Sequence, residues 1–512
     1  MENKSLFKNT IYNALYNGLN IIFPLITIPY LSRILLSDGL GLVNYSRSIV
    51  SWFLIFASLG IPRYGVREIA KIKDNRNMLN KIFTELFLYN LLSTCICVVI
   101  YMLVISKVSL FSNHYLLYMV TGIQLFLNIL NVDYLYQGLE EYVYITKRSF
   151  VVKAISLLCM FIFVKEKQDY IIYALIQSLA VAGNYVFNFI HLKKYVHFSA
   201  ENLELMKHTK PIIILLSTQL AISLYSLLDT TMLGVWCSNS VIGYYTNVQK
   251  IIITISTITA SLGGVMLPRL VFLWNHNELD AVKELGSKAL ELIIVICIPT
   301  SIGIFALAPQ IVRLIFGVDF LPCILTLKIF APFVLISTVG NLYGTQLLMT
   351  FNEEKILLIT VSAGALLNMS MNLFLIPKME QNGATIASVV TEVIVLCLQI
   401  YFVNKQVKLK CSLHFLKTLF IMMTVMILYL MIIMNFLDDD ISVIVCSILG
   451  AGCIYLILGI LLKNEAILYF VGLIKSKILT LSICIFSRGL KARMLLMILC
   501  SRYCWQKLQC QL

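Results

Sequence analysis

The sequence has 512 residues, of which 59% are hydrophobic and 13% charged, and its mean hydropathy is +0.88. A water-soluble protein needs about 25% charged residues to cover its surface, so this composition excludes a cytosolic enzyme, a secreted domain and a disordered chain. The formal net charge of +14 is interpreted as a signal of membrane topology and of an anionic cargo, not of nucleic-acid binding.

Apolar runs of membrane-spanning length follow one another along almost the whole chain. We expect an all-α polytopic membrane protein with about fourteen transmembrane helices, and the first run lacks a cleavage site, so it is expected to be a span. The ranges are 10–31, 42–61, 82–105, 114–136, 149–164, 170–192, 211–236, 244–267, 286–308, 322–348, 356–376, 384–403, 414–436 and 441–462.

These helices are expected to form two lobes. Residues 1–200 hold an N-terminal six-helix lobe, residues 201–410 a C-terminal six-helix lobe, and residues 411–465 the two extra helices. The basic C-terminal segment 466–512 is either an interfacial helix or a dispensable tail.

Basic residues are concentrated in alternate predicted loops, and this bias predicts the orientation. One set of loops carries Arg63, Arg67, Lys71, Lys73, Arg76, Lys81, Lys147, Arg148, Lys193, Lys194, Lys207, Lys210, Lys405, Lys408 and Lys410. The opposite loops carry only Arg33, Lys107, Lys165, Lys167, Arg313 and Lys378. We therefore expect both termini in the cytoplasm.

The same polar spacing occurs on helix 2 and helix 8, at an offset of 203 residues. The positions are Asn44, Arg47, Ser51 and Ser58 on helix 2, and Asn247, Lys250, Thr254 and Ser261 on helix 8. Each set lies on one helical face. Two six-helix repeats that both start in the cytoplasm are parallel repeats, which transporters arrange around a site near the membrane midplane. The alternative is that two amphipathic helices share a stripe by chance.

Arg47 and Lys250 are the sharpest candidates for a site. A cation inside the hydrocarbon costs at least ~2.5 kcal/mol, so two at matching positions predict a basic, water-filled cavity between the lobes. The alternative is snorkelling to the membrane surface, which is the preferred interpretation for Lys153 and Lys328.

The predicted cavity wall extends to neighbouring polar residues. It includes Asn44, Asn247, Ser51 and Thr254, the helix 1 stripe Asn13, Asn17 and Asn20, and Arg33 at the outer end of helix 1. Contacts between helices explain the asparagine stripe equally well, and Arg33 also fits an interfacial anchor.

Three acidic residues within or near spans are candidates for ion or proton coupling: Asp229, Asp133 and Glu392. Asp229 lies deepest, in the middle of helix 7, where a carboxylate can carry a coupling proton. A structural ion pair between Asp229 and Lys250 or Arg47 is the alternative.

No predicted loop is long enough for a soluble catalytic domain. The sequence has no GxxxxGK[ST] phosphate loop and no Cys/His spacing typical of a metal site, so we expect neither an enzyme nor a cofactor or metal. A secondary transporter of an anionic amphiphile fits best. A multidrug or cation antiporter would prefer an acidic cavity, and a membrane glycosyltransferase or polymerase usually needs a larger extramembrane loop.

Several motifs, taken in order, resemble a known family. They are Ile28-Pro-Tyr-Leu-Ser-Arg-Ile-Leu35 with Gly39-Leu-Gly-Leu-Val-Asn-Tyr45, Asp133-Tyr-Leu-Tyr-Gln-Gly-Leu-Glu140 with Ile145-Thr-Lys-Arg148, Leu227-Leu-Asp-Thr-Thr-Met-Leu-Gly234, and Gly243-Tyr-Tyr-Thr-Asn-Val-Gln-Lys250. Over about residues 5–475 the chain resembles Wzx-type polysaccharide flippases, of the multidrug/oligosaccharidyl-lipid/polysaccharide exporter superfamily.

The resemblance implies a cargo and a mechanism. The cargo would be a polyprenyl-diphosphate-linked oligosaccharide, the repeat unit of O-antigen (lipopolysaccharide) or capsule, moved from the cytoplasmic to the outer leaflet of the bacterial inner membrane. Two lobes would alternate access to the cavity without ATP hydrolysis, and Arg47 and Lys250 would bind the diphosphate. Besides the lipid bilayer, a polysaccharide polymerase and a chain-length regulator are the implied partners.

Overall fold

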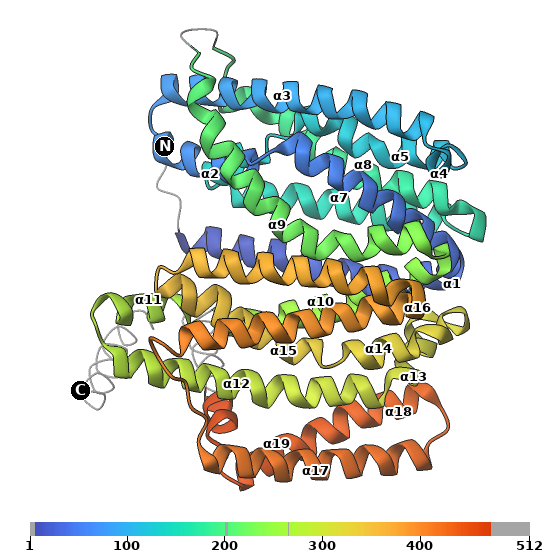
Figure 1. Ribbon diagram of the computed structural model, residues 1–512, viewed down its shortest axis with the longest axis vertical. Helices are drawn as coiled ribbons and strands as arrows, with labels where there is room; N and C mark the ends of the chain where they lie inside the picture. The colour runs from blue at the N-terminus through green and yellow to red at the C-terminus, as the bar shows by residue number, and fades with distance from the viewer. Residues whose placement is uncertain (1–5, 200–202, 265, 473–512) are drawn as a thin grey trace, which may run out of the picture.

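The computed structural model describes residues 6–199, 203–264 and 266–472, and every regular element in these ranges is a helix (Figure 1). Seven of the described helices are long and apolar enough to cross a membrane, and the bent pair Val318–Phe330 and Phe333–Leu348 is an eighth candidate. The prediction of an all-α polytopic membrane protein is thus confirmed. Of the predicted tail, residues 473–512 lie outside the described ranges.

The first set of helices precedes the linker at residues 195–205. It comprises α1 (Leu6–Ser58), α2 (Ile61–Ile72), α3 (Arg76–Lys107), α4 (Ser109–Ser112), α5 (Tyr115–Phe126), η1 (Leu127–Leu130), α6 (Asp133–Gly138), α7 (Tyr142–Phe163) and α8 (Tyr170–His191).

The second set follows the linker. It comprises α9 (Met206–Trp236), α10 (Asn239–Gly264), α11 (Leu267–Asn275), α12 (Leu279–Ala306), α13 (Ala308–Ile311), η4 (Val312–Phe316), η5 (Val318–Cys323), α14 (Ile324–Phe330), α15 (Phe333–Gly340), η6 (Asn341–Leu348) and α16 (Glu354–Val403). Then α17 (Leu413–Phe436), α18 (Asp440–Cys446), η7 (Ser447–Ala451) and α19 (Gly452–Leu461) lie at the bottom of Figure 1.

Two very long helices each contain a break. Leu36 in α1 and Glu380 in α16 have non-helical backbone angles, with φ of 57° and 49°. Positive φ is costly for an L-residue, so the surrounding packing must hold both breaks. Predicted helices 1 and 2 therefore share α1, and predicted helices 11 and 12 share α16. Each of the fourteen predicted stretches overlaps a described helix.

The same order of elements occurs in both sets. The short helix α2 follows the second half of α1 as α11 follows α10, and α3 and α12 begin at Arg76 and Leu279. These starting points are separated by 203 residues, the offset that relates the polar stripes. This is the order that two parallel repeats would produce.

Each set of helices ends in a linker whose backbone donates a hydrogen bond to a buried glutamate, which lies on α3 in the first set and on α12 in the second. The Glu204 N–H donates to Glu85 Oε1 at 2.6 Å, and the Ser412 N–H donates to Glu291 Oε1 at 2.8 Å. Both glutamates are buried. His208, in the first turn of α9, contacts the other oxygen of Glu85 at 2.8 Å. The start of α9 is therefore fixed to α3, whereas α9 farther along packs against α16.

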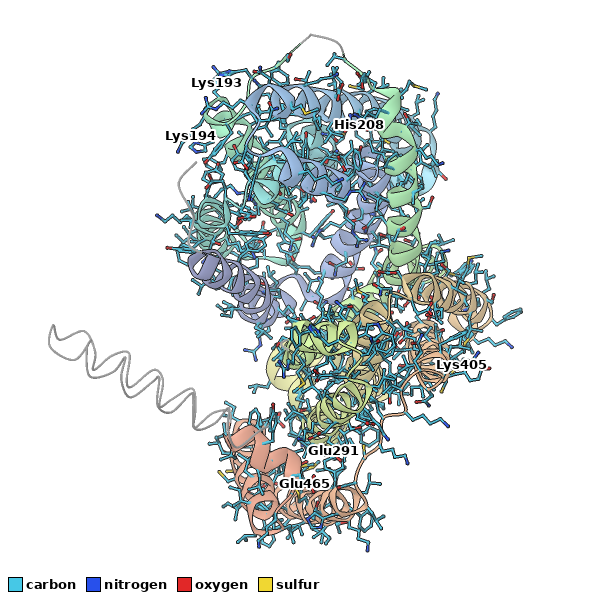
Figure 2. All side chains as sticks on the ribbon, turned by 90° about the vertical axis from the view of Figure 1, so that its left-hand side faces the viewer. Lys193, Lys194, His208, Glu291, Lys405 and Glu465 are labelled. Atoms are coloured by element: carbon cyan, nitrogen blue, oxygen red, sulfur yellow. The ribbon has the colours of Figure 1, made fainter. Side chains whose placement is uncertain are left out.

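Basic side chains gather at one end of the bundle. Figure 2 looks onto this end, where Lys193, Lys194 and Lys405 are labelled. The basic bias of the sequence predicts that these loops face the cytoplasm, and that orientation stays a prediction.

At the other end, where Leu36 lies, α1 and α10 meet backbone to backbone. A Cβ on Gly41 would lie 1.7 Å from the Asn239 carbonyl oxygen, and one on Gly243 would lie 2.1 Å from the Ser37 carbonyl oxygen. Only glycine fits at such distances. We call this contact the closed end.

Candidate functional site

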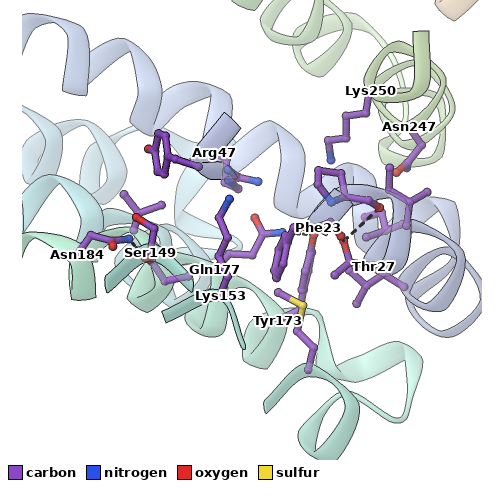
Figure 3. Close-up of a pocket in the computed structure, with 18 of the residues that line it drawn as sticks. Phe23, Thr27, Arg47, Ser149, Lys153, Tyr173, Gln177, Asn184, Asn247 and Lys250 are labelled. Carbon is purple, nitrogen blue, oxygen red and sulfur yellow. Dashed lines mark hydrogen bonds between the residues drawn. The ribbon is translucent and has the colours of Figure 1, made fainter. Parts of the chain in front are cut away.

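A cavity of about 480 Å³ lies between both halves of α1 and helices α6, α7, α8 and α10 (Figure 3). Its polar lining residues are Tyr16, Thr27, Arg47, Asp133, Arg148, Ser149, Lys153, Tyr173, Gln177, Asn184, Tyr185, Asn247 and Lys250. Apolar side chains such as Phe23, Leu31 and Leu40 complete the wall.

The described lining is strongly basic. It carries four basic side chains, Arg47, Arg148, Lys153 and Lys250, and one acidic side chain, Asp133, which is a formal excess of three positive charges. The carboxylate is neutralised locally, because Arg148 Nη1 lies 3.0 Å from Asp133 Oδ1. Figure 3 shows Arg47, Lys153 and Lys250 directed into the cavity from three different helices.

The structure brings Arg47 and Lys250 to one cavity, and an amide links their two helices. Lys250 Nζ on α10 donates to Asn44 Oδ1 on α1 at 2.9 Å, and Asn44 Nδ2 donates to Thr246 Oγ1 at 2.8 Å. Asn44 is buried in this contact and does not line the cavity, whereas Asn247 does.

Ser51 and Thr254 do not line the cavity. Ser51 Oγ donates to the Arg47 carbonyl at 2.8 Å, and Thr254 Oγ1 donates to the Lys250 carbonyl at 2.6 Å. Each hydroxyl therefore bonds the backbone of the cation one turn earlier. The two stripes therefore share this hydrogen bond as well as their spacing, and the hydroxyls of Ser51 and Thr254 bond their own helices and not the cavity.

Arg33 was predicted with the cavity group, and the structure places it elsewhere. It is exposed near the closed end, and its Nη2 donates to the Leu314 carbonyl at 2.6 Å. Arg33 follows Leu31, a cavity residue, by two positions, which is about 200° around a helix. It therefore faces η4 in the second set instead of the cavity. The Ser37 N–H beside it donates to Asp319 at 2.7 Å.

Asn13, Asn17 and Asn20 lie on the first half of α1, but their side chains fall outside the part of the chain that the structure describes. Their contribution stays a prediction. Tyr16 and Phe23 on the same half line the cavity.

Sequence reasoning missed Lys153 and Arg148. Lys153 was interpreted as a snorkelling residue and Arg148 as a loop residue, but both lie on α7 and line the cavity. A signal was present, because Ser149, Lys153 and Ser156 follow a spacing of four and three residues and so share one helical face. Lys328 has no such stripe, and its amine lies 5.6 Å from the Phe305 ring, away from the cavity.

A second polar group lies apart from the cavity, around Asp229 on α9. This carboxylate is 1% exposed and accepts hydrogen bonds from Ser388 Oγ at 2.6 Å, Asn372 Nδ2 at 2.6 Å and the Tyr245 hydroxyl. We call these four residues the Asp229 cluster. Within the described residues no ion pair includes Asp229, so the expected alternative of a pair with Lys250 or Arg47 is not what the structure shows.

The other two acidic candidates lie in different surroundings. Asp133 begins α6 and pairs with Arg148, at the edge of the basic cavity. Glu392 lies on the second half of α16 and lines a separate pocket.

Membrane-length helices that surround a polar cavity are an arrangement found in transporters. A family described as "Polysaccharide biosynthesis protein" matches residues 6–274, which is more than half of the sequence. The chain belongs to this family, and the resemblance to Wzx-type flippases is confirmed.

Similar proteins carry transporter names. The chain is 25% identical over 418 residues to the "Putative O-antigen transporter" of Escherichia coli K12, covering 80% of this chain and 99% of that protein. It is 23% identical over 409 residues to the "Putative O-antigen transporter" of Shigella dysenteriae, covering 78% and 100%. These relatives are named as transporters and not as enzymes.

Two solved structures share the fold. The lipid II flippase MurJ, in an inward closed conformation, aligns with a TM-score of 0.68 at 14% identity, over 89% of this chain and 99% of its own. An inward-facing MATE family multidrug transporter of the MOP superfamily aligns with a TM-score of 0.54 at 14% identity, over 75% and 97%.

Proposed function

We propose that this protein is a flippase that moves a polyprenyl-diphosphate-linked oligosaccharide, the repeat unit of O-antigen or capsule, across the bacterial inner membrane. The observation that carries the proposal is the excess of three positive charges in a cavity whose remaining polar lining is neutral. The names of the relatives, which are O-antigen transporters, support the same class of cargo.

The cavity suits the two polar parts of such a cargo. A diphosphate that leaves water needs cationic partners that form charge-assisted hydrogen bonds, and Arg47, Lys153 and Lys250 supply them. Sugars need amide and hydroxyl partners, which Gln177 and Asn184 offer from α8. A drug or metal cation would be repelled by the same lining, so the basic charge disfavours a cation antiporter.

In this mechanism the two sets of helices move against each other and expose the cavity to one side of the membrane at a time. With both termini in the cytoplasm, cargo enters from the inner leaflet while the closed end is shut. No ATP is needed, because each negative charge that moves outward from the negative inside gains about 2.3 kcal/mol per 100 mV. A polymerase and a chain-length regulator would receive the cargo outside.

The cation pair is tested by the double variant Arg47→Gln and Lys250→Gln. A charged hydrogen bond contributes about 1.5–3 kcal/mol, so losing two costs about 3–6 kcal/mol and is expected to weaken cargo binding by at least about a hundredfold. Surface polysaccharide should disappear and lipid-linked oligosaccharide should accumulate in the cytoplasmic leaflet, at unchanged protein level.

The matched control is Ser51→Ala with Thr254→Ala, one turn farther along the same two helices. These hydroxyls bond only their own helices, so this variant should transport normally. Unchanged surface polysaccharide in the cation variant would refute the assignment.

We further propose that Asp229 carries a coupling proton. Its three hydrogen-bond donors come from α10 and from both halves of α16, so a change in its charge would act on all of them. The variant Asp229→Asn should remove the dependence of transport on the pH gradient, which for one coupled proton is about tenfold per pH unit. Transport into vesicles with an imposed gradient measures this, and full retention of the dependence would exclude Asp229.

A further inference from the structure

A small polar pocket lies inside the first set of helices, beside the basic cavity. It encloses about 140 Å³ between the last turn of α1 and helices α2, α3 and α6. We call it the side pocket, and its described lining residues are Ser58, Ile61, Pro62, Asn90, Asn131, Asp133, Tyr134 and Gln137. Asp133 also lines the basic cavity, so the two spaces adjoin at one carboxylate.

One buried amide holds part of the side-pocket wall in place. Asn128 is fully buried, and its Oδ1 accepts hydrogen bonds from Ser58 Oγ at 3.1 Å and from Asn131 Nδ2 at 3.2 Å. Its Nδ2 donates to Asn90 Oδ1 at 3.2 Å and to Thr94 Oγ1 at 2.9 Å. A buried polar network whose members bond one another is rigid. Ser58, Asn90 and Asn131 are therefore fixed before a ligand arrives, which lowers the entropic cost of binding.

The Tyr134 hydroxyl in the same wall has no partner in the described part of the chain. Tyr134 is 3% exposed, and its hydroxyl is buried without a hydrogen bond. A buried polar atom is normally satisfied, and an unsatisfied one carries its full desolvation cost. The ring is packed against the backbone of α2, since a Cβ built on Gly65 would lie 2.5 Å from Tyr134 Cδ2. An unpartnered hydroxyl on so closely packed a ring, in the wall of a polar pocket, points to a ligand that supplies the missing bond.

The charge of the side pocket differs from that of the basic cavity. Among the described lining residues the one charged side chain is Asp133, whose Oδ1 lies 3.0 Å from Arg148 Nη1. This pairing offsets the single negative charge, so the lining favours a neutral ligand. Amides and hydroxyls both donate and accept hydrogen bonds, and a carboxylate accepts several. A polyhydroxylated molecule such as a sugar ring satisfies groups of this kind.

We propose that the side pocket binds the first sugar of the cargo, the one bonded to the diphosphate, while the diphosphate lies on the cations of the basic cavity. This proposal rests on the proposed function and adds to it the residues that select the saccharide, which are Asp133, Tyr134 and Gln137. The pocket volume equals that of about five water molecules, which is room for one sugar ring and not for an oligosaccharide. Further sugars of the repeat unit would stay in the larger cavity.

Short prenyl diphosphates separate the two parts of the cargo site. Binding to the purified full-length protein in detergent micelles is measured by isothermal titration calorimetry. The probes are farnesyl diphosphate alone and farnesyl diphosphates that carry glucose, galactose, N-acetylglucosamine or N-acetylgalactosamine. We expect at least one sugar-bearing probe to bind about tenfold or more tightly than farnesyl diphosphate, as two ordinary hydrogen bonds would give.

Tyr134→Phe removes the hydroxyl and nothing else. Because that hydroxyl has no partner in the described chain, the variant should unfold at the same Tm or higher, yet lose about fivefold of the affinity for the sugar-bearing probe. Its Kd for farnesyl diphosphate should not change. Gln137→Ala, at an exposed position of the pocket, should lower the affinity for the sugar-bearing probe as well.

Tyr101→Phe is the matched control. The Tyr101 hydroxyl donates to the Tyr118 carbonyl at 2.6 Å, and Tyr101 does not line the side pocket. This variant should therefore lose stability and keep the preference for the sugar-bearing probe.

The side-pocket proposal is overturned if no sugar-bearing probe binds more tightly than farnesyl diphosphate. It is also overturned if the preference survives in both Tyr134→Phe and Gln137→Ala, or is lost equally in Tyr101→Phe. A farnesyl diphosphate affinity that does not change in the double variant Arg47→Gln and Lys250→Gln contradicts the cation assignment and not the side pocket. Absence of binding by every probe overturns both.

Discussion

The basic cavity and the Asp229 cluster differ in the sign of their charged side chains and in how many hydrogen bonds the protein makes to those side chains. The cavity holds four cations around about 480 Å³ of space, with one carboxylate among them. The Asp229 cluster holds one carboxylate that is 1% exposed and surrounded by three hydrogen-bond donors. The basic side chains of the cavity face open space, whereas the protein itself supplies the hydrogen bonds to the Asp229 carboxylate.

This difference indicates how a two-part transporter can divide its work. A large anion needs room and several cations, which the first set of helices and α10 provide. A buried carboxylate that accepts hydrogen bonds from neutral donors is suited to gaining and losing a proton. The proposed function places cargo binding in one region and coupling in the other, and the following variants test that division.

The largest effect is expected from Arg148→Met, which would show whether Arg148 belongs to the cargo cations. Arg148 is buried and paired with Asp133, whose side chain is 35% exposed. Removing one partner of a buried pair costs about 3–5 kcal/mol, and we expect about 3 kcal/mol here because water reaches Asp133. A lower midpoint of unfolding in detergent micelles measures this.

Adding Asp133→Asn to Arg148→Met should restore more than half of the lost stability, since no unpaired carboxylate then remains. If Arg148→Met is instead stable but inactive, Arg148 contacts the cargo directly, and the cavity uses all four of its cations.

A smaller effect is expected from Lys153→Gln, which removes one cation from the cavity. Losing one charged hydrogen bond should slow delivery of polysaccharide about tenfold at equal protein level. Lys328→Gln is the matched control, because Lys328 Nζ lies 5.6 Å from the Phe305 ring much as Lys153 Nζ lies 5.7 Å from the Phe23 ring, but outside the cavity. Equal transport by the two variants would mean that Lys153 has no cargo role.

The smallest effect is expected from Ser388→Ala, which removes one donor from the Asp229 cluster. Hydrogen bonds between membrane helices contribute about 0.6 kcal/mol on average, so stability should fall by about that amount. Ser370→Ala on the same long helix is the control, because Ser370 Oγ bonds only the Leu366 carbonyl of its own helix. A loss no larger than that of the control would show that Ser388 does not support Asp229.

Much of the fold could be predicted because apolar runs of membrane length report helices directly. The breaks at Leu36 and Glu380 could not be placed by residue, since neither position has glycine or proline to mark it. The packing of neighbouring helices holds those angles, and that information is spread over the chain.

The site was predicted in part, and the errors share a cause. Matched spacing identified Arg47 and Lys250, but it also included Ser51 and Thr254, which turn to their own backbones. Spacing gives the face of a helix, whereas the neighbours decide where the cavity begins and ends. Lys153 was missed for the same reason, because it was judged by its distance from a helix end and not by its face.

The closed end has an electrical consequence. At Gly41 and Gly243 the two main chains lie too close for water to fit between them, whereas the nearby polar cavity offers space for water. A membrane voltage falls mostly across the driest and thinnest part of its path. The field would therefore fall on the few residues between Arg47 and the closed end, so an anion bound by the proposed cations would have nearly the whole voltage still to cross.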